Sequence, residues 1–248
     1  MKMVPCILTA LGAIALTPTA SAALVLGDTI GIDFGKTAST DPNNTWNNLS
    51  VGGNETTAGL ADSGTVVLSS GTVLNTSNII VPDVSFSFTN SSGQIAWDFG
   101  TAGNAGIGLF TDSTVYGDSI ISNDKTGTPF RPVQSGTDTF VFTFAGLNDA
   151  LSYELVGGWS HGNGNFEANW SADGQSFNTL IAPGNGYGSL TGLETDGSGN
   201  LVITVTGVGG AGHITASGLT LKAVPEPSGT LLFGAGGILL LLRRVRRV

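Results

Sequence analysis

Three stretches of the chain, residues 84–88, 139–144 and 201–205, alternate large apolar side chains with polar or smaller ones at a period of two. A period of two is the repeat of an extended strand, in which successive side chains point to opposite faces of a sheet. The apolar face of each strand is then expected to lie in a core. The buried residues predicted in this way are Phe86, Phe88, Phe140, Phe142, Leu201, Ile203 and Val205.

Six further segments have the composition of strands, and turn-forming pairs such as Asp173-Gly174 separate several of them. These segments are Thr29–Phe34, Ile95–Phe99, Ser152–Gly157, Phe166–Ser171, Phe177–Ile181 and His213–Lys222. About ten strands joined by turns favour two packed antiparallel sheets. We therefore predict an all-β fold for residues 23–223, a jelly-roll-like antiparallel β-sandwich, with Trp97 and Trp170 in the core or on a sheet face. The polar stretches Ala38–Asn54 and Gly100–Gln134 are expected to be surface loops.

The body of the chain is strongly acidic. All eighteen Asp and Glu residues lie between Asp28 and Glu226, and the basic residues in that range are Lys36, Lys125, Arg131 and Lys222. Proteins bind nucleic acid by neutralising phosphates with Lys and Arg, so this composition excludes nucleic acid as a partner. Polyanionic sugars would be repelled as well, whereas neutral glycans and divalent cations are compatible with the charge.

The first 22 residues have the three parts of a secretory signal peptide. Lys2 supplies the positive start, Val4–Leu16 the apolar helix, and Ala20-Ser21-Ala22 the small residues of a cleavage site. We expect the secretion machinery to export the chain and signal peptidase to remove residues 1–22. The single cysteine, Cys6, lies in this leader, so the mature domain has no disulfide and depends on its core alone.

A proline-rich elbow, an apolar run and a basic cap follow one another in residues 224–248. The elbow is Pro225-Glu226-Pro227, and the apolar run Thr230–Leu242 is predicted to be a transmembrane helix. Its thirteen residues would span roughly 20 Å, against roughly 30 Å for a hydrocarbon core, so it is a marginal permanent anchor. The basic cap holds its end on the cytoplasmic side and consists of Arg243, Arg244, Arg246 and Arg247.

This order of elbow, apolar run and arginines resembles the PEP-CTERM sorting signal of exported bacterial proteins. The resemblance implies that an exosortase-like membrane enzyme cuts near the Pro-Glu-Pro motif. It also implies a transient stay in the inner membrane and a final place at the cell surface, in the outer envelope or in an extracellular exopolysaccharide matrix. An ordinary tail anchor is the alternative.

A second resemblance lies in the body of the chain. The segment Ile30–Gly35, followed by Thr45–Leu49, is similar to the first strand and loop of malectin-like or galactose-binding-like modules. Leu151–Leu155 and the segments between residues 166 and 216 are similar to the closing strands of such sandwiches. The middle of the chain, Ser50–Gln134, carries no such resemblance. What the resemblance implies is a β-sandwich that binds carbohydrate.

Two clusters combine tryptophan with amide or imidazole side chains. They are Trp46, Asn47 and Asn48, and Trp159, His161 and Asn163. Aromatic rings stack on the apolar faces of sugars while neighbouring amides hydrogen-bond the hydroxyl groups. We therefore predict that these residues bind a neutral polysaccharide. The alternative is structural, with both tryptophans packed at the rim of the sandwich and the asparagines serving turns.

The sequence indicates neither a catalytic nor a metal site. His161 and His213 lie in different segments and no cysteine is available, so a zinc site lacks its usual ligands. The loops Asp112–Asp124 and Asp196–Asn200 could offer oxygen ligands to calcium, but neither has EF-hand spacing; turns are favoured and no cofactor is expected. The predicted function is a non-catalytic carbohydrate-binding or structural module associated with exopolysaccharide. A carbohydrate-active enzyme, a glycosidase or polysaccharide lyase, and a protein-binding adhesin are the alternatives.

Overall fold

The computed structural model describes residues 24–53, 59–60, 64–91, 95–99, 115, 119–123, 139–160, 167–179, 185–208 and 214–225. Within these residues the chain forms strands, turns and bends and no helix, which confirms the predicted all-β fold. The predicted leader and the tail beyond Pro225 lie outside the described residues. No helix with the length and apolar character of a membrane span occurs among the residues described.

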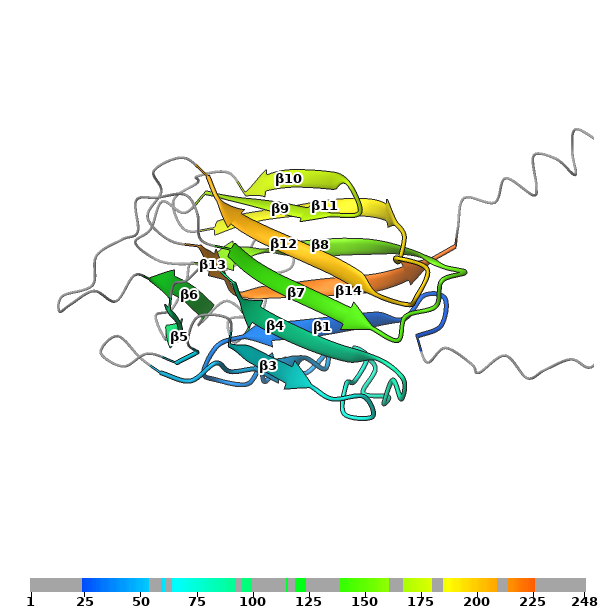
Figure 1. Ribbon diagram of the computed structural model, residues 1–248. Coiled ribbons are helices and arrows are strands. Elements are labelled where there is room, and N and C mark those ends of the chain that lie inside the picture. Colours follow the sequence, from blue (N-terminus) through cyan, green and yellow to red (C-terminus); the bar gives the residue numbers. More distant parts are fainter. Residues whose placement is uncertain are drawn as a thin grey trace, which may run out of the picture.

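Fourteen strands of the described part of the chain form three sheets, and the two larger sheets are the layers of a sandwich (Figure 1). One layer has the order β11-β8-β14-β1-β2, the other the order β10-β9-β12-β7-β4-β3, and the smaller sheet is β13-β6-β5. Pairing is antiparallel except between β1 and β2. The bounds are β1 Thr29–Phe34, β2 Asn47–Leu49, β3 Thr65–Leu68, β4 Ser85–Asn90, β5 Ile95–Phe99, β6 Ser119–Asn123, β7 Thr139–Ala145, β8 Ser152–Ser160, β9 Ala168–Ala172, β10 Gln175–Thr179, β11 Asn185–Leu193, β12 Leu201–Gly207, β13 Thr215–Ala216 and β14 Gly218–Val224.

The core between the two layers confirms the predicted alternation. The residues predicted to be inward-facing on β4, β7 and β12 are all buried: Phe86, Phe88, Phe140, Phe142, Leu201, Ile203 and Val205. Phe142 lies at the centre of an aromatic cluster, with its ring centroid 4.8 Å from that of Phe34 in the opposite layer and 5.9 Å from that of Trp170 on β9. Trp170 is fully buried, as predicted, whereas the side chain of Trp97 is not among those described.

Four strands lie where strands were not predicted. The short strand β2 falls in the expected loop Ala38–Asn54, and its Leu49 packs in the core, while β6 falls in the expected loop Gly100–Gln134. Neither β3 nor β11 was predicted. These strands are short, at a sheet edge, or rich in glycine, so they lack a strong period-two pattern, and pairing with a neighbouring strand is what extends them.

The outer face of the six-stranded sheet carries side chains opposite to the core residues. The pairing register places one row of them across all six strands, namely Ser176, Ser171, Thr204, Val141, Thr89 and Thr65. The β9–β10 hairpin closes through Asp173 and Gly174, whose φ angles of 47° and 71° suit a tight two-residue turn, as the sequence predicted. This face is therefore built mainly from hydroxyl groups.

Candidate functional site

The structure places Trp159 in the interior, and the predicted exposure of this residue is wrong. Its side chain is 0% exposed near the end of β8. The sequence predicted that this strand ends at Gly157, but it continues to Ser160, so residue 159 keeps the inward parity of Tyr153 and Leu155. A buried indole offers no face for a sugar. The other two members of this predicted cluster, His161 and Asn163, lie outside the described residues.

Asn47 and Asn48 serve the structure. The side-chain amide of Asn47 donates hydrogen bonds to the carbonyl oxygens of Gly31 (2.9 Å) and Leu74 (2.7 Å), and its oxygen accepts one from the Leu74 amide (2.8 Å). The amide of Asn48 donates to the carbonyl oxygen of Gly35 at 3.3 Å. Both N–H groups of the buried Asn47 side chain are thus used within the fold, as the structural alternative expects, and its role in binding sugar stays a prediction.

Trp46, like Asn48, keeps a partly exposed side chain. Its indole nitrogen donates a hydrogen bond to the Asp41 carboxylate at 3.3 Å. That carboxylate also accepts from the Asn44 side chain at 3.0 Å and the Asn43 amide at 2.8 Å. Slight burial raises the pKa of Asp41, but the bonds from Asn44, Asn43 and Trp46 outweigh it and hold this pKa below its ordinary value. Trp46 is thus held in place at neutral pH.

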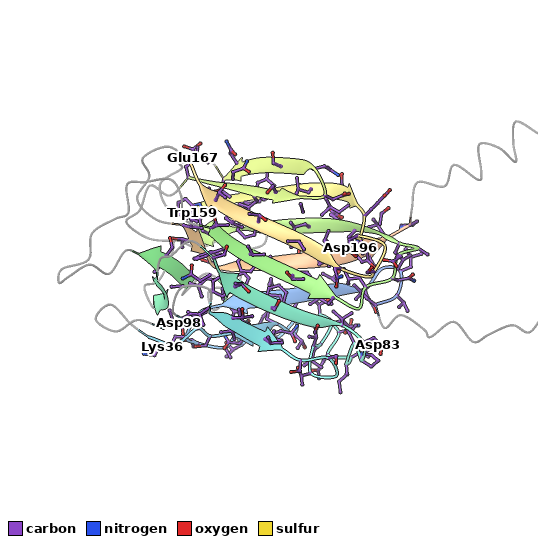
Figure 2. The ribbon with its side chains drawn as sticks, in the orientation of Figure 1. Lys36, Asp83, Asp98, Trp159, Glu167 and Asp196 are labelled. Atoms are coloured by element: carbon purple, nitrogen blue, oxygen red, sulfur yellow. The ribbon has the colours of Figure 1, made fainter. Side chains whose placement is uncertain are left out.

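A polar groove of about 350 Å³ lies on the outer face of the six-stranded sheet, over β9, β10 and β12. Figure 2 shows these strands in the upper part of the molecule, where Glu167, the residue just before β9, is labelled, whereas Asp83 is labelled in the lower part. The residues that line the groove are Asn169, Ser171, Ala172, Asp173, Gly174, Gln175, Ser176, Val202 and Thr204. Hydroxyl and amide groups make up most of its functional atoms. Asp173 is the one charged residue in this lining, and it lies in the hairpin turn.

Hydrogen bonds within the fold orient the polar groups of the groove. The hydroxyl of Ser171 donates to the carbonyl oxygen of Thr204 at 3.2 Å, and the amide of Asn169 donates to the side-chain oxygen of Asn178 at 2.6 Å. The amide of Gln175 donates to the carbonyl oxygen of Thr191 on β11 at 3.1 Å. Hydroxyl groups can donate and accept at once, so they are able to bind a ligand that itself carries many hydroxyl groups.

Sequence reasoning missed this groove. Its residues come from three strands that are separated by up to 35 positions in the chain, and only the pairing register brings them together. The signal that the sequence does carry is the hydroxyl and amide character of the outward positions on these strands.

The buried carboxylate of Asp98 has a structural role. It accepts hydrogen bonds from the Ser50 hydroxyl and from the amides of Val51 (2.9 Å) and Gly52 (3.1 Å). Burial raises the pKa of Asp98 above its ordinary value of 3.8, although these hydrogen bonds and the charge of Lys36 oppose the rise. The bonds tie the loop after β2 to β5.

The loop Asp196–Asn200, one of the two weighed for calcium, is closed by its own hydrogen bonds. Asp196 accepts from the Ser198 amide at 2.8 Å, from the Asn200 amide at 3.1 Å and from the Asn200 side chain at 3.0 Å. The Asn200 side chain above all lowers the pKa of Asp196. The described residues contain no group of three or more His, Cys, Asp or Glu side chains placed to hold a metal ion. Most of the other loop, Asp112–Asp124, is outside the described residues.

Comparisons with known proteins give distant similarities. No family model and no curated protein matches the chain. Among solved structures, it is similar to protein YxiM from Bacillus subtilis, with 17% identity over 80% of this chain and a TM-score of 0.38, and it spans 41% of that protein's length.

Two carbohydrate-binding modules are similar as well. The CBM35 module from Cellvibrio japonicus has 11% identity, covers 52% of this chain and 89% of the module, and has a TM-score of 0.29. The family 11 module from Clostridium thermocellum has 9% identity, covers 57% of this chain and 90% of the module, and also has a TM-score of 0.29. Similarities this low transfer no function, so the surface of this chain must carry any functional proposal.

Proposed function

We propose that the sandwich is a non-catalytic module that binds neutral polysaccharide in the groove over β9, β10 and β12. The observation that carries this proposal is the lining of the groove, in which hydroxyl and amide side chains stand in register with a single carboxylate at one end. Neighbouring strands lie about 4.8 Å apart, so the hydroxyl groups of Ser176, Ser171 and Thr204 form an evenly spaced row.

Charge narrows the class of ligand. The groove lining has no Lys or Arg, and the only ionisable lining residue is the carboxylate of Asp173. A polyanion would gain no ion pair there and would be repelled by the acidic body of the chain. A neutral polysaccharide needs no counter-charge and can exchange hydrogen bonds with each hydroxyl of the row.

Affinity electrophoresis through gels that contain soluble neutral polysaccharides tests the groove. We would compare the full chain with a double variant, Ser176→Ala with Thr204→Val. Loss of two hydrogen bonds should cost about 1–3 kcal/mol, which is a rise in Kd of roughly 5- to 150-fold. The matched control is Ser87→Ala with Thr89→Val, on β4 of the same outer face. Equal retardation of the groove variant and wild type would contradict the proposal, as would equal weakening in the control.

The proposed setting of this module is the cell surface or an exopolysaccharide matrix, reached by export and PEP-CTERM sorting. Support comes from the order of the sequence motifs and from the end of β14, since Val224 ends the strand and Pro225 is exposed. Pro225, the first residue of the elbow, thus lies at the surface of the sandwich, as cutting by an exosortase-like enzyme would require. Mass spectrometry of the protein from its native host is the test. An exported pool that still carries Arg243–Val248 would show that the tail is a permanent anchor.

A further inference from the structure

We infer that the sandwich carries a second polysaccharide-binding surface around Trp46, on the outer face of the five-stranded sheet, so that one domain can bridge two polysaccharide chains. This inference rests on the proposed function for the class of ligand. It is based on a different part of the molecule, the segment before β2 and the outward residues of β1, β14, β8 and β11.

The ring of Trp46 lies flat on β1. A Cβ added to Gly31 would be 2.8 Å from Cε3 of the indole and 3.1 Å from each of Cδ2 and Cζ3. Three successive ring atoms at nearly equal distances mean that the ring presents its face, not its edge, to the strand. Ile30 and Ile32 face the core, so Gly31 faces outward and the glycine leaves room for the indole. The opposite face of the ring therefore points away from the sheet.

Polar and apolar side chains continue the surface beside this ring. The register pairs Gly31 with Thr220 on β14, Thr220 with Val156 on β8, and Val156 with Ser189 on β11. The side chains of Thr220, Val156 and Ser189 are all at least partly exposed. The row therefore offers, next to an aromatic face, two hydroxyl groups and one aliphatic group at the spacing of the strands.

A second aromatic residue bounds the surface at its other side. Tyr187 on β11 is 44% exposed and is paired with Gly158 of β8, on the outer face of the same sheet. Three strand spacings separate β1 from β11, which is roughly 14 Å. A short stretch of a neutral oligosaccharide can extend over this distance, with rings stacked on Trp46 and Tyr187.

The two surfaces cannot serve one site. The groove lies on the outer face of the six-stranded layer, Trp46 lies on the outer face of the five-stranded layer, and the whole hydrophobic core separates them. A polysaccharide chain bound on one face therefore leaves the other face open for a second chain. The consequence is crosslinking by a monomer.

Low-shear viscosity and affinity electrophoresis together test bridging. The probes are a galactomannan, a xyloglucan and a mixed-linked β-glucan, each mixed with the full chain after size-exclusion chromatography has confirmed a monomer. The wild-type protein should raise the low-shear viscosity of each polysaccharide that slows its migration in affinity electrophoresis. Trp46→Ala, Tyr187→Ala and the groove double variant should each abolish thickening yet keep measurable retardation. Trp46→Ala combined with the groove changes should lose both. Val67→Ala, an exposed aliphatic on β3, is the control.

Each outcome separates the two surfaces. Thickening and retardation unchanged in both Trp46→Ala and Tyr187→Ala would overturn the second surface and leave the groove standing. Loss of all retardation in Trp46→Ala, with the groove variant unchanged, would overturn both the groove and bridging. A wild type that no probe retards would overturn the proposed function together with this inference. Tyr187→Ala guards against misfolding, since its exposed phenol can be removed without opening the core.

Discussion

Replacement of Phe142 by Ala tests the packing that holds the two layers together. Phe142 is fully buried on β7, and its ring contacts rings from both layers. The centroid distances are 4.8 Å to Phe34, 5.3 Å to Phe88, 5.9 Å to Trp170, 6.0 Å to Phe86 and 6.2 Å to Phe140. These neighbours come from three strands besides β7 itself, namely β1, β4 and β9, so no single shift can fill the space that the ring leaves.

The expected loss of unfolding free energy is about 3–5 kcal/mol, the range for Phe→Ala in a core that cannot collapse. The upper part of the range applies, because the aromatic pairs add to the loss of buried area. For a domain of about 200 residues, each kcal/mol lowers Tm by roughly 2–4 °C. A loss of about 4–5 kcal/mol should therefore lower the Tm of the variant by about 8–20 °C relative to wild type.

Thermal and urea unfolding, followed by far-ultraviolet circular dichroism, measure this loss. Val141→Ala is the matched control, because Val141 is adjacent on β7 but faces outward and is partly exposed. The control should change stability by about 1 kcal/mol or less. A Phe142→Ala variant that loses no more than Val141→Ala would refute the assignment of Phe142 to the core and the alternation on which it rests.

Two further predictions concern buried titratable groups. The Tyr153 hydroxyl donates to the Asn148 carbonyl oxygen (3.0 Å) and accepts from its amide (2.9 Å), so Tyr153→Phe should lose about 1–3 kcal/mol of unfolding free energy. Burial raises the pKa of Tyr153 from 10.0 to about 12, so the stability difference between wild type and Tyr153→Phe should shrink between pH 10 and 12. A difference in unfolding free energy that stays constant over this pH range in urea titrations would contradict this prediction. The raised pKa of Asp98 means that its protonated form favours folding. The unfolding free energy of wild type relative to Asp98→Asn should therefore fall as pH rises above 3.8. An increase in this relative stability over the same pH range would contradict the prediction.

Much of the strand content could be predicted, because alternation is a local property. The predicted bounds Thr29–Phe34 and Ile95–Phe99 are those of β1 and β5. The prediction for His213–Lys222 was less accurate, since the structure divides that stretch into β13 and β14 with a break at Ser217. The break has no local sequence signal, because it arises where the chain passes from the smallest sheet to the five-stranded one.

The candidate site was less predictable. Composition drew attention to Trp46 and Trp159, which carry the same side chain in similarly polar surroundings. Their exposures differ because Trp159 occupies an inward-facing position of β8. Trp46 instead donates a hydrogen bond to Asp41 and packs against Gly31 on the outer face of β1. Which tryptophan remains available to a ligand is thus decided by neighbours that are distant in the sequence.

The sequence by itself determined that the body of the chain is all-β, which side chains of β4, β7 and β12 are buried, and that this body is strongly acidic. Each of these depends on composition or on the two-residue repeat of a strand, which acts over a few residues. Only the tertiary structure decided the order of the strands, the groove that joins Ser171, Ser176 and Thr204, and the packing of the Trp46 indole against Gly31. Those features depend on which strands pair and in what register, and pairing across long stretches of chain is fixed by the packing of the whole core.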